Sequence, residues 1–233
     1  MAFLFDVSFW EKAMKIPISD RLLACAGFVH SGDRVADIGC DHGYLGIHLL
    51  KNGIAASMIE ADINEGPLDA ARRNALKFGV RDKMSFHLSD GLLAVPQDFD
   101  CMVCAGMGAD TMISILEAAP WLKSCKYRLV LQCQSKTPIL REYLSRQGWY
   151  IRKEIVLRDG RFLYTVMEVL YAPEEPRLTA AQCHFPPALV KEPSAELSAY
   201  YQWVRDGLAI SAAHSEEKKR TLEALEALPY GAK

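Results

Sequence analysis

The sequence predicts a doubly wound α/β fold built on a mostly parallel sheet of seven strands. Between residues 34 and 147, five short apolar segments alternate with helix-like segments, and such alternation is typical of a parallel sheet covered on both faces. Two further strand segments then follow each other with no helix between them. A proline-rich stretch leads to a region whose apolar residues have helical spacing. We therefore expect a sheet domain at residues 1–172 and a helical, coiled-coil-like domain at residues 173–233.

Caps and turn residues set the bounds of the first half. Ser19-Asp20 is a helix cap, and Asn52-Gly53 is a helix stop. Gly66-Pro67 starts a longer helix, because proline suits the first helical turn. The strands expected here are 34–38, 55–61 and 84–88, and the helices are 21–29, 44–51 and 66–78.

In the second half the pattern changes from alternation to a hairpin. Asp159-Gly160, a strong hairpin signal, separates the last two strands. Residues 173–193 have little periodic structure and predict a linker, whereas 194–228 predict one long helix or a helical pair, broken near Gly207 or near His214-Ser215. The expected strands are 101–105, 128–132, 149–157 and 162–171, and the expected helices end at 118 and span 138–147.

Composition limits the classes of protein that fit. The net charge of −2 gives no global basic field for nucleic acid, so an RNA contact would need local patches. The apolar N-terminus is interrupted by Asp6 and Glu11 and lacks a basic start, so it does not fit a signal peptide. No run reaches the roughly 18 apolar residues of a membrane span. Seven cysteines, an odd number, favour a reduced compartment, so we expect a cytoplasmic protein.

One acidic, glycine-bearing turn stands out at the end of the first strand. Gly39 and Gly43 permit close backbone approach at a helix N-terminus, but Asp37 argues against a phosphate there. A carboxylate at this position suits a cation, such as the amino group or sulfonium of S-adenosylmethionine. About twenty residues later comes Asp62, at the spacing that holds ribose hydroxyls in nucleotide-binding α/β domains. Glu60 is its rival, and strand phase favours Asp62.

These segments together resemble one family. The chain is similar to the bacterial tRNA (adenine-22-N1)-methyltransferases, which are class I, Rossmann-like enzymes that use S-adenosylmethionine. The motifs that carry the resemblance are Ala36–Leu45 (ADIGCDHGYL), Asp62–Leu68 (DINEGPL), Asp90-Gly91-Leu92, Ala105–Gly108 (AGMG), Leu131-Gln132 and Leu140-Arg141. The family also has a C-terminal helical domain. The resemblance implies tRNA as the partner and methyl transfer to adenine N1 at position 22.

The resemblance also implies roles for individual residues. Asp37 would hold the methionine amino group, Asp62 both ribose hydroxyls, and Asp90 the adenine amino group, unless Asp90 only caps a turn. The target adenine would lie against Tyr44, Met107 and Gly108, although a helix tyrosine is more often a core residue. The full set expected around the cofactor is Asp37, Gly39, Cys40, Asp41, His42, Gly43, Asp62, Ile63, Asn64, Asp90, Gly91, Ala105 and Gly106.

The implied chemistry needs positioning more than proton removal. Adenine N1 carries its own lone pair, so alignment and exclusion of water could supply much of the rate. An acceptor for the target amino group would help, and the candidates are Asp41, the carbonyls of Ala105 and Gly106, and Gln132. His42 is an alternative base that this reaction does not require. The histidines show no metal-ligand spacing, so we expect no metal.

Other interpretations stay open. Ala109-Asp110 and Cys133-Gln134 depart from the family pattern and are compatible with a methyltransferase of another substrate, or with a non-catalytic RNA-binding module. Tyr200, Tyr201 and Trp203 fit a coiled-coil seam better than a base-stacking platform. Cys101 and Cys104, although spaced C-x-x-C, lie in a strand and point to opposite faces, which favours core residues. We expect a monomer or a weak dimer.

Overall fold

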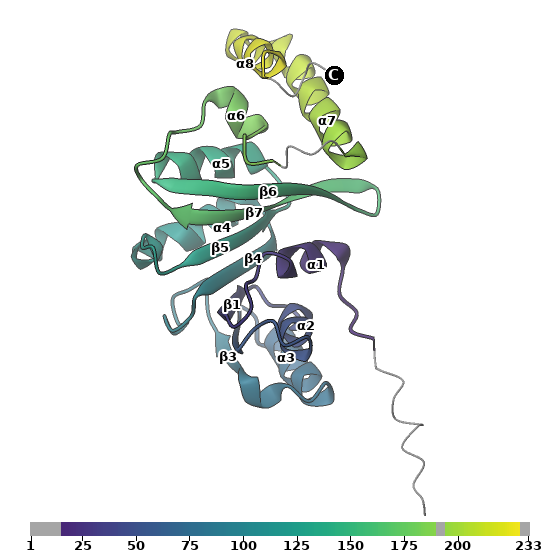
Figure 1. Cartoon of the computed structure of the whole chain (residues 1–233), viewed down its shortest axis with the longest axis vertical. Helices are drawn as coiled ribbons and strands as arrows, with labels where there is room; N and C mark the ends of the chain where they lie inside the picture. Colours follow the sequence, from purple (N-terminus) through teal and green to yellow (C-terminus); the bar gives the residue numbers. More distant parts are fainter. Residues whose placement is uncertain (1–14, 190–193, 229–233) are drawn as a thin grey trace, which may run out of the picture.

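The computed structural model describes residues 15–189 and 194–228, and it confirms the predicted seven-stranded sheet (Figure 1). The strand order is β3-β2-β1-β4-β5-β7-β6. Strands β1 to β5 are parallel, and β7 runs antiparallel to both β5 and β6. The strands are β1 (Arg34–Ile38), β2 (Ser57–Asp62), β3 (Met84–Leu88), β4 (Cys101–Met107), β5 (Arg128–Cys133), β6 (Trp149–Asp159) and β7 (Phe162–Tyr171).

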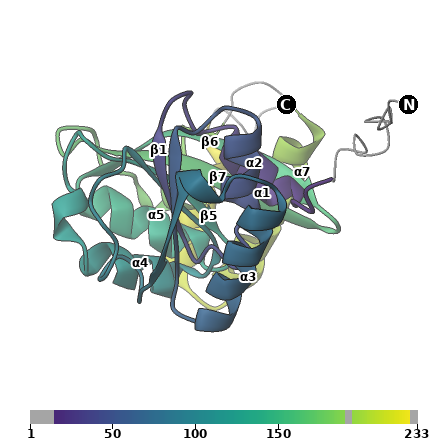
Figure 2. The same ribbon diagram turned by 90° about the horizontal axis from the view of Figure 1, so that it is seen from below.

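Helices cover both faces of the sheet, as expected for a doubly wound fold (Figure 2). Apolar residues of α1, α2 and α3 form one core with the sheet, and those of α4 and α5 form the other. The expected N-terminal extension at 1–18 falls mostly outside the described residues. The helices up to the last strand are α1 (Asp20–Ala26), α2 (Tyr44–Lys51), α3 (Glu65–Lys77), α4 (Ala109–Glu117) and α5 (Thr137–Arg146), with short 3₁₀ turns η2 (Arg81–Lys83) and η3 (Pro120–Leu122).

Several predicted bounds were wrong by a few residues. Helix α1 ends at Ala26 instead of residue 29, and β2 starts at Ser57 instead of residue 55. Strand β4 extends to Met107 through a bulge between Ala105 and Met107, which the pattern did not predict. The predicted linker contains a helix, α6 (Ala180–His184), started by a capping box of Thr179 and Gln182.

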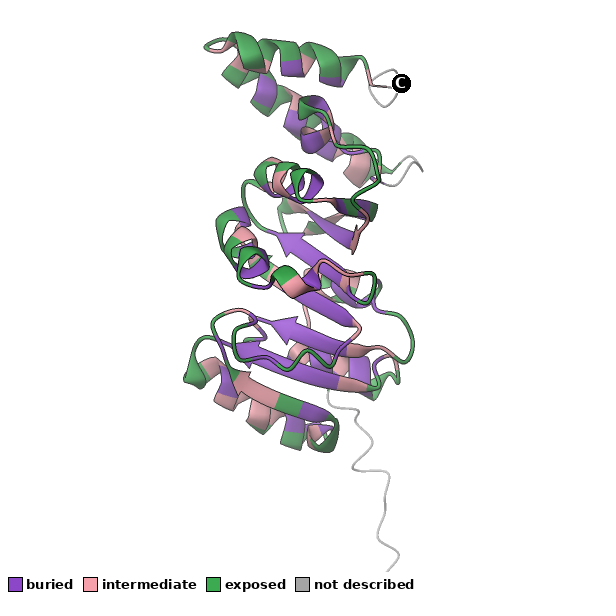
Figure 3. Ribbon diagram, turned by 90° about the vertical axis from the view of Figure 1, so that its left-hand side faces the viewer, coloured by how far each residue is buried: buried purple, intermediate pink, exposed green. Residues whose placement is uncertain are grey.

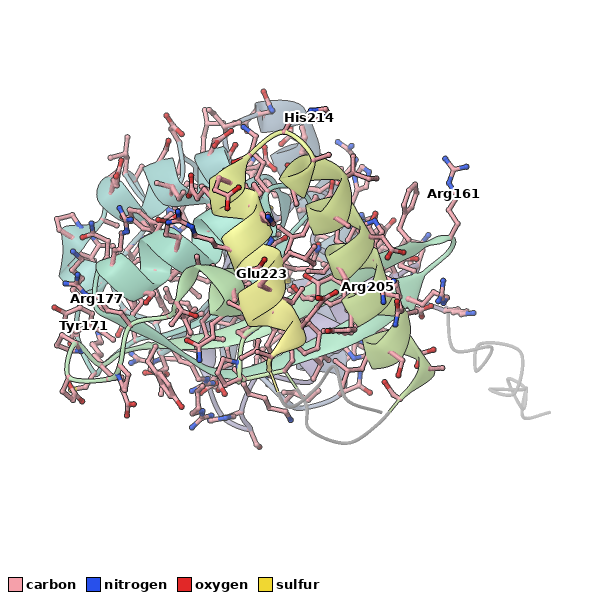
Figure 4. All side chains as sticks on the ribbon, turned by 90° about the horizontal axis from the view of Figure 1, so that it is seen from above. Arg161, Tyr171, Arg177, Arg205, His214 and Glu223 are labelled. Carbon is pink, nitrogen blue, oxygen red and sulfur yellow. The ribbon has the colours of Figure 1, made fainter. Side chains whose placement is uncertain are left out.

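The C-terminal region is a helical pair, α7 (Ala195–Ala212) and α8 (Glu216–Glu226). The break lies near His214-Ser215, where the Ser215 hydroxyl caps α8, and not at Gly207, which lies inside α7. The two helices run side by side across the edge of the sheet, joined by a turn at His214 (Figure 4). Their apolar faces form a third core with Val156 of β6 and Leu163 of β7.

A buried ionic network links α5, α6 and α7 to strand β6 at this edge of the sheet. The Arg141 guanidinium of α5 donates to Glu154 Oε1 of β6 at 2.6 Å and to the Tyr200 hydroxyl of α7 at 3.2 Å. It also donates to the carbonyls of Cys183 and His184, each at 3.0 Å. Figure 3 shows the same organisation by burial, with buried strands inside and exposed outer faces on the C-terminal helices. Among the described residues, no helix is long and apolar enough to cross a membrane.

Candidate active site

The candidate site lies at the point in the sheet where the order of successive strands reverses. From β1 the strands proceed outward through β2 to β3, whereas β4 and β5 lie on the other side of β1. In open α/β sheets, ligands bind outside the carboxyl ends of the strands at such a point. Asp37, Asp62 and the Ala105–Gly108 segment all lie at these ends.

The loop after β1 is shaped for close approach of a ligand. Gly39, Asp41 and Gly43 have positive φ values of 80°, 50° and 70°. A Cβ atom on Gly39 would lie 2.2 Å from Cε at the flexible end of Met107, which could move aside, so the φ of 80° is what favours glycine there. The loop is tied to β2, because the amides of Gly39 and Cys40 donate to the Ala61 carbonyl at 2.8 and 3.0 Å.

Asp62 fixes the loop from the neighbouring strand. Its carboxylate accepts from the Asp41 amide at 3.2 Å and from the Asn64 amide at 2.9 Å. A carboxylate has about four lone-pair sites, so these two bonds leave capacity for two hydroxyl donors. Next to Asp62, the Ile63 side chain is 61% exposed, which offers an apolar surface beside the site.

Asp37 is buried beneath the loop, with 4% of its surface exposed. Burial raises its pKa to about 7, with further contributions from the charges of Asp62 and Asp41. Buried carboxylates that repel one another are stabilised by a cation, whereas an anionic ligand would add to the repulsion. The electrostatics of the site therefore favour a positively charged ligand.

Glu60, the rival of Asp62, is placed differently. It is fully buried beside α2, where a Cβ atom on Gly46 would lie 1.9 Å from Glu60 Oε1. Neither carboxylate oxygen of Glu60 makes a hydrogen bond of ordinary geometry among the described residues. The Cys40 thiol is the neighbouring polar group that interacts with it. Burial and the charge of Asp37 raise the pKa of Glu60 well above its usual value. Glu60 is thus a group beneath the site and does not line it.

On the far side of Asp62 lie Asp90 and Gly91. Asp90 is exposed, and Gly91 has a φ of 53°. A Cβ atom on Gly91 would lie 2.8 Å from Ile115 Cγ1, so glycine also permits close packing here. The position of Asp90 leaves its carboxylate accessible to a ligand.

The segment after β4 is held by Gln132. The Gly106 amide donates to Gln132 Oε1 at 3.1 Å, and the Arg21 guanidinium donates to the same oxygen at 3.2 Å. The Gln132 amide nitrogen donates to the Cys133 carbonyl at 3.2 Å. Gln132 is completely buried, so these contacts make it a support for Gly106.

Sequence patterns gave no sign of Arg21. It reaches the site from α1, pairs with Asp159 at 2.9 Å, and lies 5.1 Å over the Tyr164 ring. Only the tertiary structure brings these distant segments together, and no local motif could have indicated it.

The surroundings of the remaining candidate residues indicate no particular chemistry. Tyr44 packs partly buried against the core, with its ring 5.8 Å from the half-exposed His42. His42 Nε2 lies 3.7 Å from Asp41 Oδ1. Cys101 and Cys104 are buried free cysteines, which confirms them as core residues. No group of three or more potential metal ligands occurs in the described part of the chain.

The sheet order, with an antiparallel β7 inserted between β5 and β6, and the acidic loop after β1 define the methyltransferase class of doubly wound folds. A family model described as "Methyltransferase domain" matches residues 18–167, and the chain belongs to this family.

Two relatives make the resemblance more specific. The chain is 31% identical over 154 residues to the tRNA (adenine(22)-N(1))-methyltransferase of Bacillus subtilis, and the match covers 66% of this chain and 65% of that protein. The alignment thus spans just under two thirds of the relative's length. A crystal structure of a candidate tRNA (m1A22) methyltransferase from Streptococcus pneumoniae has a TM-score of 0.80 at 28% identity, covering 93% of this chain and all of that one.

A second structure of the Streptococcus protein contains S-adenosyl-L-methionine. It has a TM-score of 0.79 at 29% identity, and it covers 93% of this chain and 100% of that chain. These comparisons confirm the family resemblance that the motifs indicated.

Proposed function

We propose that this protein transfers a methyl group from S-adenosylmethionine to N1 of an adenine in tRNA, at position 22. The observation that carries the proposal is the buried Asp37 at the glycine-bearing loop, within a chain that resembles adenine-22 methyltransferases. When bound, S-adenosylmethionine supplies an activated methyl group on a sulfonium.

The residues of the chain fit that cofactor. Asp37 would attract its positive charge, and the two remaining acceptor sites of Asp62 would take the ribose hydroxyls. Asp90 would accept from the adenine amino group, and Ile63 would contact one face of the ring. Gly39 and Gly43 would let the main chain approach. The complete cofactor set stays as predicted from the sequence.

The target adenine would be held by the segment after β4. The carbonyls of Ala105 and Gly106, together with Asp41, would accept from its amino group and leave the N1 lone pair directed at the methyl group. Gln132 would act by fixing Gly106, to which it is hydrogen-bonded at 3.1 Å. Tyr44, Met107 and Gly108 would line the pocket. An adenine stacked in RNA must be extruded to enter it.

The wider assignments belong to the same proposal. We infer a cytoplasmic protein that acts as a monomer or a weak dimer, with its cofactor domain at residues 1–172 and its helical domain at 173–233. The cysteine usage supports the first inference, because all but Cys125 of the described cysteines are buried and free.

Label transfer tests the proposal. Purified protein is incubated with methyl-labelled S-adenosylmethionine and transcripts that carry adenosine or guanosine at position 22. We expect label only in the adenosine transcript, and loss of transfer in Asp37→Ala. Asp98→Ala, an exposed carboxylate paired with Arg34 away from the site, is the matched control and should retain transfer. Absence of label in any tRNA would refute the proposal.

A second candidate function is methylation of another substrate by the same fold. Ala109, which replaces a glycine of the family pattern, is fully buried at the start of α4, directly after Gly108. Label that enters a protein or a small molecule, but not tRNA, would favour this candidate.

A further inference from the structure

A pocket of about 370 Å³ lies between the sheet domain and the C-terminal helices, and no step of the proposed reaction uses it. Its walls come from the β5–α5 loop, the start of β7, α6, α7 and the start of α8. We call it the α5–α7 pocket. Its volume is within the range of sites that hold small organic groups.

The pocket adjoins the segment that would hold the target adenine. The Gln134 amide, in its wall, donates to the Met107 carbonyl at 2.8 Å. The next wall residue, Ser135, accepts from the Ala109 amide at 3.1 Å. A molecule in the pocket would therefore lie one loop away from the active site.

The charge of the pocket contrasts with the rest of the chain. Its lining includes Lys136 and Lys218 but no carboxylate among the described residues, although the chain carries a net charge of −2. The Lys136 ammonium pairs with Asp110 at 2.6 Å, which leaves Lys218 to supply the charge. The Lys218 ammonium forms no ion pair within the described residues. Burial, aided by the charges of Lys218 and Arg141, lowers the pKa of the adjacent His184 to about 4. The Lys218 side of the pocket is thus electropositive.

The lining also offers aromatic surface. Trp203 is 66% exposed, and its ring lies 5.7 Å from that of Tyr200 at an angle of 34°. Tyr164 also borders the pocket from the start of β7, but the Arg21 guanidinium of α1 already lies over its ring. The aromatic group at 200–203 is therefore divided: Tyr200 and Tyr201 are buried in the helical seam, and Trp203 is available for stacking.

One buried polar group in the lining has no partner. The Thr165 hydroxyl is buried, and it makes no hydrogen bond among the described residues. Because this oxygen has almost no accessible surface even with the pocket empty, a molecule in the pocket does not reach it, and the site proposed below does not include it.

We propose that the α5–α7 pocket binds an unpaired nucleotide of the RNA substrate, distinct from the adenosine that is methylated. The base stacks on Trp203, and Lys218 contacts a phosphate. Stacking on aromatic side chains combined with basic groups is the usual chemistry of single-stranded RNA sites. The inference rests on the proposed function for the identity of the RNA.

The test measures tRNA binding by filter retention, separately from methyl transfer. Trp203→Ala should weaken binding about 10-fold, the effect expected of one stacked base. Ile210→Ala, on the same helix and 74% exposed, is the matched control and should bind as the parent does. Affinity for S-adenosylmethionine, measured by calorimetry, should be unchanged in both, which shows that the fold is intact.

Two further variants test the contribution of the Lys218 charge and the limits of the site. Lys218→Ala should reduce the slope of log affinity against log salt by about one, whereas Lys219→Ala should not. Thr165→Val is a second control and should leave tRNA binding unchanged, because the buried hydroxyl it removes does not reach the pocket.

The outcomes separate the two proposals. Methyl transfer by the parent, together with parental tRNA affinity in Trp203→Ala and Lys218→Ala, overturns the pocket and leaves the function. Binding that depends on Trp203 without any methyl transfer supports the pocket and removes the function. If the parent binds no tRNA at all, both are wrong.

Discussion

At the scale of the residue, Asp37 has the most consequential environment. The loop and two other carboxylates enclose it, and these raise its pKa to about 7. Because the folded-state pKa lies above the ordinary value near 3.8, the fold favours the neutral, protonated form of Asp37. The stability that this raised pKa contributes is fully present below pH 3.8 and is lost as the pH rises through 7. A bound cation reverses this preference.

The affinity for S-adenosylmethionine should therefore depend on pH. Below pH 7 the proton on Asp37 must leave before the cation binds, so the dissociation constant should rise by up to about tenfold per pH unit. Calorimetry from pH 5.5 to 8 measures this. Asp90→Asn is the control, because it should weaken binding and keep the pH dependence. A flat profile in both proteins would contradict the role of Asp37.

At the scale of the element, the junction of α5, β6 and α7 depends on one ion pair. Arg141 and Glu154 are both fully buried, and Tyr200 completes their contacts from α7. In a buried pair the loss of one partner leaves the other charge uncompensated in the interior. The C-terminal helices are thus coupled to the sheet by a group that tolerates little change.

Arg141→Ala should lower the free energy of unfolding by about 3–5 kcal/mol, because it leaves the buried Glu154 carboxylate without its partner. Urea unfolding measures the loss. Glu142→Ala, which breaks the exposed Glu142–Arg146 pair on the same helix, should cost less than about 0.5 kcal/mol. The double variant Arg141→Met, Glu154→Leu should recover only part of the stability, because it removes both buried charges but leaves the Cys183 and His184 carbonyls without their donor. Equal small losses in both single variants would show that the network is not important.

At the scale of the whole molecule, three large apolar cores and one small cluster around Leu68 hold the described residues together. Two lie on opposite faces of the sheet, and the third joins the C-terminal helices to Val156 and Leu163 at its edge. The candidate site draws its residues from segments spread between positions 21 and 132, so its geometry exists only in the folded state. A ligand bound there stabilises the entire fold.

S-adenosylmethionine at 100 times its dissociation constant should add about 2.7 kcal/mol to the stability. For a chain of this size the melting temperature should rise by about 5–10 °C. Scanning calorimetry with and without the cofactor tests this, and Asp37→Ala should show no rise. A rise in that variant equal to the parent's would place the cofactor elsewhere.

The sequence determined the alternation of strands and helices, the hairpin at Asp159-Gly160 and the motifs at the strand ends, because each of these is a local signal. The sequence did not predict the short helix α6, because five residues are too few to show a helical period. The residues of its capping box, Thr179 and Gln182, are nevertheless visible in the sequence. For the C-terminal region the pattern left two break points, and the Ser215 cap decided between them.

Only the tertiary structure decided which side chains meet. The contact of Arg21 with Gln132 joins residues 111 positions apart, and the space that Gly46 leaves for Glu60 depends on how α2 packs on β2. The pKa of Asp37 and the division between buried Tyr200 and exposed Trp203 likewise follow from packing. Local patterns specify backbone conformation and direction, whereas burial and charge proximity depend on distances between segments that no local pattern contains.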